Sequence, residues 1–85
     1  MKLHEPYDHV GKLLEIGDRI IVRTIPHQLI HDLPEEDIEA IKSQVGKALV
    51  ISGFNEYGYV ELDFVDPVGT MHTIWMEPAS VARME

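Results

Sequence analysis

Three runs rich in β-branched and aromatic residues fill residues 47–77, and two short turn-forming segments separate them. These segments are Asn55-Glu-Tyr-Gly58 and Asp66-Pro-Val-Gly69, each with Asn or Asp first and glycine fourth. That spacing is typical of a type I turn followed by a glycine with positive φ, which joins antiparallel strands through a β-bulge. The pattern therefore predicts a three-stranded antiparallel meander over residues 47–77.

The turns also predict which side chains share a face, because side chains alternate along a strand. With Asn55 opposite Tyr59 and Asp66 opposite Thr70, the core row contains Val50, Ser52, Phe54, Val60, Leu62, Phe64, His72, Ile74 and Met76. The opposite, outer face then carries Leu49, Ile51, Tyr59, Glu61, Asp63, Val65, Met71, Thr73, Trp75 and Glu77. So many apolar residues on an outer face predict that something covers it: residues 1–16, a second copy of the chain, or a different partner.

The rest of the chain predicts two more strands and one helix. A strand over residues 19–25, with Ile20 and Val22 on one face, ends at Pro26. After a loop over residues 26–33, Asp32-Leu-Pro-Glu35 marks the start of a helix of about three turns with an apolar stripe of Ile38, Ile41 and Val45. Residues 78–85 predict a 3₁₀ turn and a short final strand.

This order of elements resembles an SH3-like small barrel: mainly β, five-stranded, with one helix inserted after the first strand. Three segments, Gly17-Asp-Arg-Ile-Ile-Val-Arg23, His31-Asp-Leu-Pro34 and Val45-Gly-Lys-Ala-Leu-Val-Ile51, are similar to the barrel domain of nitrile hydratase β-subunits and related electron-transport accessory proteins. The resemblance implies a barrel domain over residues 17–85, preceded by an N-terminal arm over residues 1–16, that supports or binds another protein. It implies no catalytic role, because the acidic loop after His31 lacks the arginines that the β-subunit places near its partner's metal.

Charge and composition narrow the classes of partner. The 85 residues include 15 acidic and 7 basic side chains, for a net charge of −8, which argues against nucleic acid and anionic membranes as partners. The absence of cysteine excludes disulfides, thiol catalysis and thiolate metal sites. No apolar run is long enough to cross a bilayer, and the first residues do not resemble a secretion signal, so we expect a soluble cytoplasmic protein.

Several residues are candidates for chemical sites. His27 and His31 are four apart, a spacing that suits zinc or nickel with His4, His9 and Asp32 as further ligands, but exposed loop histidines are the favoured interpretation. His72, in the core row, is interpreted as a buried neutral imidazole bonded to a backbone carbonyl or to Ser52.

Glu61 and Asp63 form a possible acid–base pair, yet no nucleophile motif or phosphate-binding glycine loop accompanies them. We therefore predict no catalytic, cofactor or metal site.

Trp75 and Tyr59, framed by Glu61, Asp63 and Glu77, support two functional hypotheses. The first is a non-catalytic protein-interaction or accessory module that forms a homodimer through the outer face of the meander, using Tyr59, Val65, Met71 and Trp75. The alternative is a cleft near Trp75 and Tyr59 that binds a small cationic or amphipathic ligand. An enzyme is the third reading, and the sequence offers no substrate for it.

Overall fold

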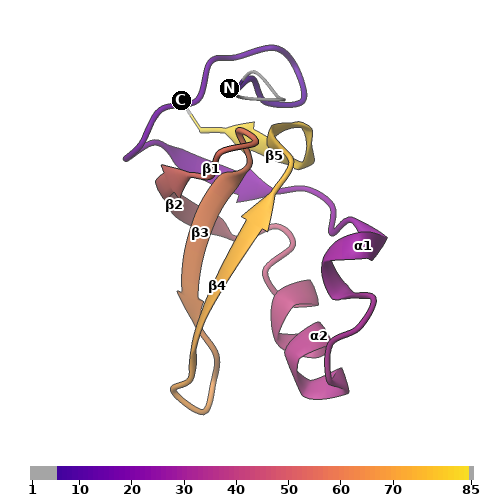
Figure 1. Ribbon diagram of the computed structural model, residues 1–85. Helices are drawn as coiled ribbons and strands as arrows, with labels where there is room; N and C mark the ends of the chain where they lie inside the picture. Colours follow the sequence, from indigo (N-terminus) through magenta and orange to yellow (C-terminus); the bar gives the residue numbers. More distant parts are fainter. Residues whose placement is uncertain (1–5, 85) are drawn as a thin grey trace.

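The computed structural model describes residues 6–84 as five antiparallel strands in one sheet, accompanied by two short helices (Figure 1). The strands follow the order β4-β3-β2-β1-β5, and within residues 6–84 no backbone pairing joins β4 to β5. The fold is therefore mainly β, as predicted, but the sheet is not closed into a barrel. The strands are β1 (Arg19–Val22), β2 (Ala48–Phe54), β3 (Val60–Val65), β4 (Met71–Met76) and β5 (Val81–Arg83); the helices are α1 (His27–Ile30) and α2 (Glu35–Lys42), and a 3₁₀ turn spans Pro78–Ser80.

Both hairpin turns form as predicted. Asn55 N donates to Tyr59 O at 3.0 Å, and Asp66 N donates to Thr70 O at 2.9 Å. The glycines of these turns have φ of 85° and 89°, which is the left-handed conformation that a glycine bulge requires. The predicted pairing of β3 with β4 follows, since Val60, Leu62 and Phe64 lie opposite Met76, Ile74 and His72 respectively.

The predicted pairing of β2 with β3 is correct next to the turn and wrong farther from it. Phe54 lies opposite Val60 as expected, but the register then shifts between Gly53 and Ile51, so that Ile51 lies opposite Leu62. Ile51 is buried, while Ser52 and Val50, both predicted for the core row, are exposed. The extra residue of this bulge places an isoleucine in the core instead of a serine, which increases the apolar area removed from water.

The same bulge lets β2 serve two parts of the sheet. Its first half pairs with β1, where Leu49 lies opposite Ile20, and its second half pairs with β3. Bulged strands bend, and Figure 1 shows β1, β2 and β5 running across one end of the long β3–β4 hairpin. The bend encloses one hydrophobic core.

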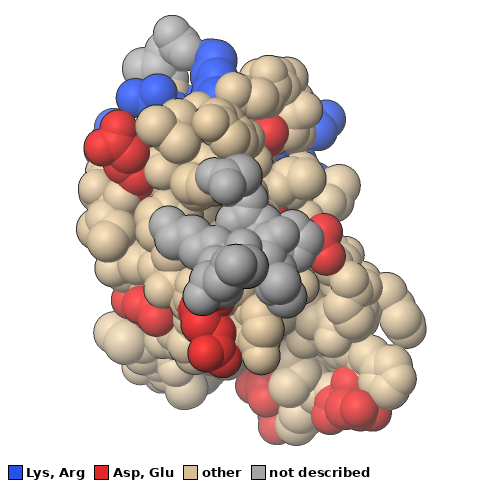
Figure 2. Space-filling model, turned by 45° about the horizontal axis from the view of Figure 1, so that its top comes forward, with Lys and Arg blue, Asp and Glu red and all other residues tan. Residues whose placement is uncertain are grey.

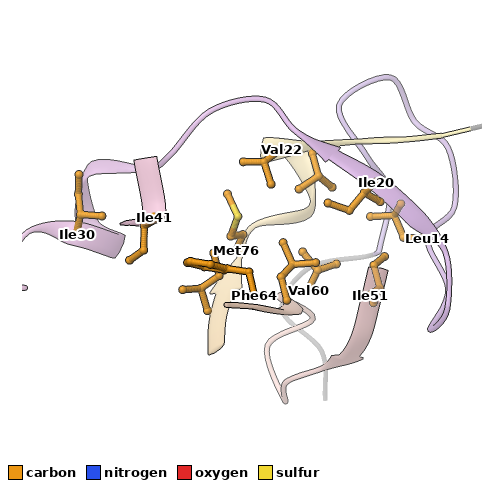
Figure 3. Close-up of a cluster of buried hydrophobic side chains, with 12 residues drawn as sticks. Leu14, Ile20, Val22, Ile30, Ile41, Ile51, Val60, Phe64 and Met76 are labelled. Atoms are coloured by element: carbon orange, nitrogen blue, oxygen red, sulfur yellow. The ribbon is translucent and has the colours of Figure 1, made fainter. Parts of the chain in front are cut away.

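Core residues come from every part of the described chain (Figure 3). Ile30 and Ile41, from the two helices, lie at one end of the cluster, and Phe64 and Met76 lie next to them. Leu14, from the segment before β1, lies at the other end beside Ile20 and Ile51. The remaining members are Val22, Val60, Leu62, Ile74 and Val81.

The helical region differs from the prediction in number and length. One turn of helix, α1, occupies the expected loop, and the second helix, α2, has eight residues instead of about three turns. It begins after Pro34 with no side-chain cap, so Asp32 does not start it. Val45, expected on the helical stripe, forms an isolated parallel bridge with Val22.

Residues 6–16 pack beside β5 and the core, away from the outer face of the β3–β4 hairpin. His9 N donates to Val81 O at 3.2 Å, Arg83 N donates to Asp8 Oδ2 at 2.8 Å, and Leu14 is buried. On the outer face Val65 and Met71 remain 56% and 67% exposed. The described part of the arm therefore does not cover this face, and residues 1–5 lie outside the described residues.

Candidate functional site

The outer-face residues predicted to form the interface or ligand site lie along β3 and β4 and next to them, but they do not form one patch; they are Tyr59, Glu61, Asp63, Val65, Met71 and Trp75. Glu61 lies opposite Trp75, Asp63 opposite Thr73, and Val65 opposite Met71. The face therefore has an aromatic end with Tyr59 and Trp75, a polar middle, and an apolar end beside the β3–β4 turn.

Neighbouring side chains hold the two carboxylates of the polar middle. Thr73 Oγ1 donates to Asp63 Oδ1 at 2.6 Å, and Ser52 Oγ donates to Glu61 Oε2 at 3.0 Å. Glu61 also lies close to Gly53, where a Cβ would come within 3.6 Å of Glu61 Oε2. Each carboxylate therefore accepts a hydrogen bond from a different hydroxyl group.

The aromatic end forms one wall of a cleft of about 280 Å³ between β4 and α1. Tyr59, Trp75, Met76 and Glu77 line the side of the sheet, and Pro26, Gln28 and Leu29 line the side of the helix. Gln28 Nε2 donates to Glu77 Oε1 at 3.4 Å, which links the two sides.

Helix α1 was not predicted, and it supplies half of this cleft. Pro26 ends the extended segment after β1 and, with φ of −61° and ψ of 138°, precedes the single helical turn as its N-cap. That turn buries Ile30 in the core and turns Gln28 and Leu29 to the cleft. The sequence signal was a proline followed by the apolar pair Leu29-Ile30, which is too short to separate from a loop.

The cleft combines apolar and aromatic walls with one carboxylate. Its volume falls just below the ~300–1,000 Å³ that is usual for small-molecule sites, so it suits a small ligand or a single side chain. An indole ring beside a carboxylate attracts a cation through the ring face and through charge. The geometry can therefore hold an amphipathic cation.

A second hollow, of about 470 Å³, lies along the bent strand β2. It contains Arg19 and Asp63, which carry opposite charges, and most of its residues are exposed, so it is a shallow depression. The sequence predicted Asp63 beside Trp75, but it lines this hollow and not the cleft at Trp75. The other lining residues are Ala48, Leu49, Val50 and Ser52.

His72 lies on the core side beside Phe64, as predicted, but with a different partner. Its Nε2 is 2.9 Å from Asp66 Oδ2, and its ring stacks on Phe64 with centroids 5.0 Å apart. The predicted backbone carbonyl or Ser52 is not its partner, because the bulge turns Ser52 to the outer face. The hydrogen bond from His72 is the main reason that the pKa of Asp66 lies below its ordinary value, with further help from the N–H groups of Thr70 and Val68.

The remaining histidines do not assemble a metal site in the described residues. His27 and His31 do lie close, with ring centroids 5.8 Å apart, and His31 Nδ1 is 2.9 Å from Asp32 Oδ1. His9 Nδ1 instead pairs with Arg23 Nη1 at 2.9 Å, and His4 falls outside the described part. Across residues 6–84 there is no group of three or more His, Cys, Asp or Glu side chains arranged to hold a metal ion.

A scan against protein-family models, a search of curated proteins and a search of solved structures found no match for this chain. The resemblance to nitrile hydratase β-subunits is therefore neither supported nor contradicted by them. Among residues 6–84, neither helix has the length and apolar character needed to span a bilayer.

Proposed function

We propose that this protein is a non-catalytic binding module, and that its site is the cleft between Trp75 and α1. The ligand carries a cationic or amphipathic group. The observation that carries this proposal is the meeting of Trp75, Tyr59 and Glu77 in one cleft. The geometry favours this ligand site over self-association through the whole outer face, because hydrogen-bonded carboxylates divide that face into two apolar ends.

An SH3-like architecture is part of the proposal. Three features support it: the strand order β4-β3-β2-β1-β5, a second strand that bends at a bulge to serve both halves of the sheet, and a 3₁₀ turn directly before the last strand. In such a fold the cleft would lie beside the end of the fourth strand, where an inserted helix forms its other wall.

The ligand proposal is tested with phenethylammonium as an amphipathic cation and 2-phenylethanol as its neutral control. Trp75 is the only tryptophan, so its fluorescence reports directly on the cleft. We expect a saturable change with the cation and a much weaker one with the alcohol. A response to neither compound, or an equal response to both, contradicts a cation site.

Two substitutions assign the binding to these side chains, with calorimetry as the measurement. Trp75→Leu should weaken phenethylammonium binding by ~0.5–2 kcal/mol, the usual size of a cation–π contribution. Glu77→Gln should also weaken it, and the loss should shrink at high salt because the carboxylate acts through charge. Glu36→Gln, in α2 and outside the cleft, is the control for net charge.

A second candidate function, homodimerisation, is supported by the apolar end of the outer face. Val65 and Met71 lie opposite each other and are exposed, and Val68 at the tip of the same hairpin is 86% exposed. Light scattering during size-exclusion chromatography tests this candidate at several concentrations. A dimer that Met71→Ser dissociates and Val50→Ser does not would support it, whereas a monomer at every concentration would rule it out.

A further inference from the structure

Strand β4 ends the sheet, and one of its edges is free within the described residues. Alternate residues of an antiparallel strand direct their N–H and C=O groups to opposite sides. Thr70 O accepts from Asp66 N, so Thr70 directs its backbone toward β3, and Met71, Thr73 and Trp75 direct theirs away. No backbone hydrogen bond from residues 6–84 reaches these outward groups.

The other edge of the sheet is covered. On β5, Val81 O accepts from His9 N at 3.2 Å, and Arg83 N donates to Asp8 Oδ2 at 2.8 Å. The segment before β1 thus bonds two of the outward backbone groups of β5, Val81 O and Arg83 N. The two edges of one small sheet are therefore treated differently.

Strand β4 also lacks the usual protections of an exposed edge. Natural edges are commonly blunted by charged residues, proline, bulges or a very short strand. The six residues of β4, Met71-His-Thr-Ile-Trp-Met76, contain no Lys, Arg, Asp, Glu or Pro and pair with β3 without a bulge. Such an edge is a template for another extended chain.

The free edge leads into the cleft. Trp75 takes part in both, since its backbone is the last of the outward groups and its side chain lines the cleft. Beyond it, Pro26, Gln28 and Leu29 form the opposite wall of the cleft. From Met71 to Trp75 the edge is ~14 Å long at ~3.4 Å per residue, which matches about five residues of an added strand.

The acidic residues near the free edge favour a basic partner strand. Residues 48–82 contain no Lys or Arg, and their acids include Glu61 and Asp63, one strand behind the free edge, and Glu77 in the cleft. Figure 2 shows the same asymmetry, because Lys and Arg appear only in the upper part of that view. An added strand would lie ~10 Å from β3, a distance that Lys or Arg side chains reach across. A second copy would instead bring a second net charge of −8 to the same acids.

We infer that the outer edge of β4 docks an extended basic segment of another protein, which adds a sixth strand to the sheet and inserts one side chain into the cleft at Trp75. This inference rests on the proposed function, because both use the cleft. It adds the class of partner, a basic peptide segment, and the way in which that partner is held, by backbone hydrogen bonds.

The probe is a capped hexapeptide of alternating lysine and valine, with a glutamate–valine hexapeptide as the control. Two signals are followed together: Trp75 fluorescence for the cleft, and NMR hydrogen exchange of the Met71, Thr73 and Trp75 amides for the edge. We expect the lysine peptide to change the fluorescence and to slow exchange of these amides by about tenfold or more at saturation. Equal protection by the glutamate peptide overturns the basic partner.

A matched pair of variants separates the edge from the side chain. Thr73→Pro removes the central outward N–H without removing a ladder bond to β3, and Thr73→Val keeps that N–H while losing the hydroxyl bond to Asp63. The proline variant should lose about tenfold or more in peptide affinity, and the valine variant should stay within about twofold. A peptide N-methylated at alternate residues makes the same test on the wild-type protein and does not depend on the folding of a variant.

The outcomes distinguish this inference from the proposed function. If phenethylammonium binds but N-methylation leaves peptide affinity unchanged, strand addition is wrong and the cleft remains a ligand site. If neither the small cation nor the lysine peptide affects Trp75, both proposals fail. If the edge amides are already protected without peptide and the solution mass doubles, the occupant is a second copy, and the inference is overturned.

Discussion

At the scale of single residues, the carboxylate of Asp8 accepts hydrogen bonds from three backbone N–H groups. Its Oδ1 accepts from Val10 N and Lys12 N at 3.0 and 2.9 Å, and its Oδ2 accepts from Arg83 N at 2.8 Å. Burial opposes its ionisation, but these hydrogen bonds outweigh burial, and the pKa of Asp8 lies below its ordinary value. One buried carboxylate thus joins the segment before β1 to the last strand.

Replacing Asp8 should be costly. Asp8→Ala removes the acceptor of three backbone N–H groups, and a hydrogen bond to a charged group contributes ~1.5–3 kcal/mol. We therefore expect the free energy of unfolding in urea to fall by at least that amount. Asp32→Ala, at an exposed ion pair with His31, is the control and should change it by less than ~0.5 kcal/mol. Equal losses in the two variants would contradict the role assigned to Asp8.

The lowered pKa values of Asp8 and Asp66 predict sensitivity to acid. A carboxyl whose folded pKa lies below the unfolded value of 3.8 stabilises the fold fully above that value, and the contribution disappears as the pH falls through the folded pKa. The melting temperature should therefore fall when the pH is lowered from about 5 to about 3.

Asp66→Asn provides the matched comparison for this acid effect. The amide oxygen still accepts from Val68 N and Thr70 N, but the charged partner of His72 is gone. The melting temperature of this variant should be lower than that of the wild type at pH 5 and should fall less on acidification. An unchanged pH dependence would show that Asp66 does not contribute.

Residue partners were predictable only where they are local. Asn55 and Asp66 bond to N–H groups two and four residues ahead, so a four-residue motif was enough to predict their turns. Asp8-His-Val-Gly11 has the same spacing, and its backbone forms the same turn with Gly11 at φ of 87°. That motif was available in the sequence, but its bond to Arg83, 75 residues away, was not.

At the scale of elements, the β3–β4 hairpin depends on its turn glycine. Gly69 has φ of 89°, a conformation that costs a residue with a Cβ ~1–2 kcal/mol. Gly69→Ala should therefore lower the free energy of unfolding by about that amount. Gly53→Ala is the control, because Gly53 lies in a strand without positive φ and its added Cβ would make an ordinary contact with Glu61. A loss at Gly53 as large as that at Gly69 would contradict this account.

Elements built from local signals were predicted well, and those set by distant packing were not. The meander, the 3₁₀ turn and the short last strand follow from turn residues and β-branched runs. The bulge in β2 has one local cue, Gly53 inside the strand, but alternation assigns Ser52 to the core, and the packing of Ile51 against the core reverses this assignment. Helix α1 likewise depends on the burial of Ile30, and a helix of four residues is too short to show a helical pattern in the sequence.

At the scale of the whole molecule, charge opposes compaction. The net charge of −8 is spread over 85 residues, and like charges repel more strongly in the folded chain than in the unfolded one. Raising sodium chloride from about 0.02 M to about 0.2 M shortens the Debye length to below ~10 Å and should raise the melting temperature. Sodium sulfate at matched ionic strength separates screening from ion-specific effects. A melting temperature that falls with salt would mean that attractive pairs such as Arg83 with Asp18 dominate.

The candidate cleft was predictable only in part, because its two walls come from segments that are far apart in the sequence. Trp75 and Tyr59 stand out in the sequence as aromatic residues among acids, and the structure places both in the cleft. Its other wall comes from residues 26–29, which are more than 40 positions away from Trp75 along the chain and were assigned to a loop. Which of the acids joins the aromatics also depended on the three-dimensional arrangement, since Glu77 lies in the cleft and Asp63 does not.

The unequal edges of the sheet limit how far any assembly can grow. Within residues 6–84 the β4 edge is open and two backbone groups of the β5 edge are bonded, so pairing through β4 would join two copies, or one copy and a peptide, without offering an equivalent edge to a third. Asp8 and His9 enforce this limit by occupying the β5 edge. Releasing these two residues would open a second sheet edge, and pairs of molecules could then grow into longer assemblies. If the β4 edge pairs as inferred, the carboxylate of Asp8 that holds the N-terminal segment in place would also keep such pairs from growing into fibres.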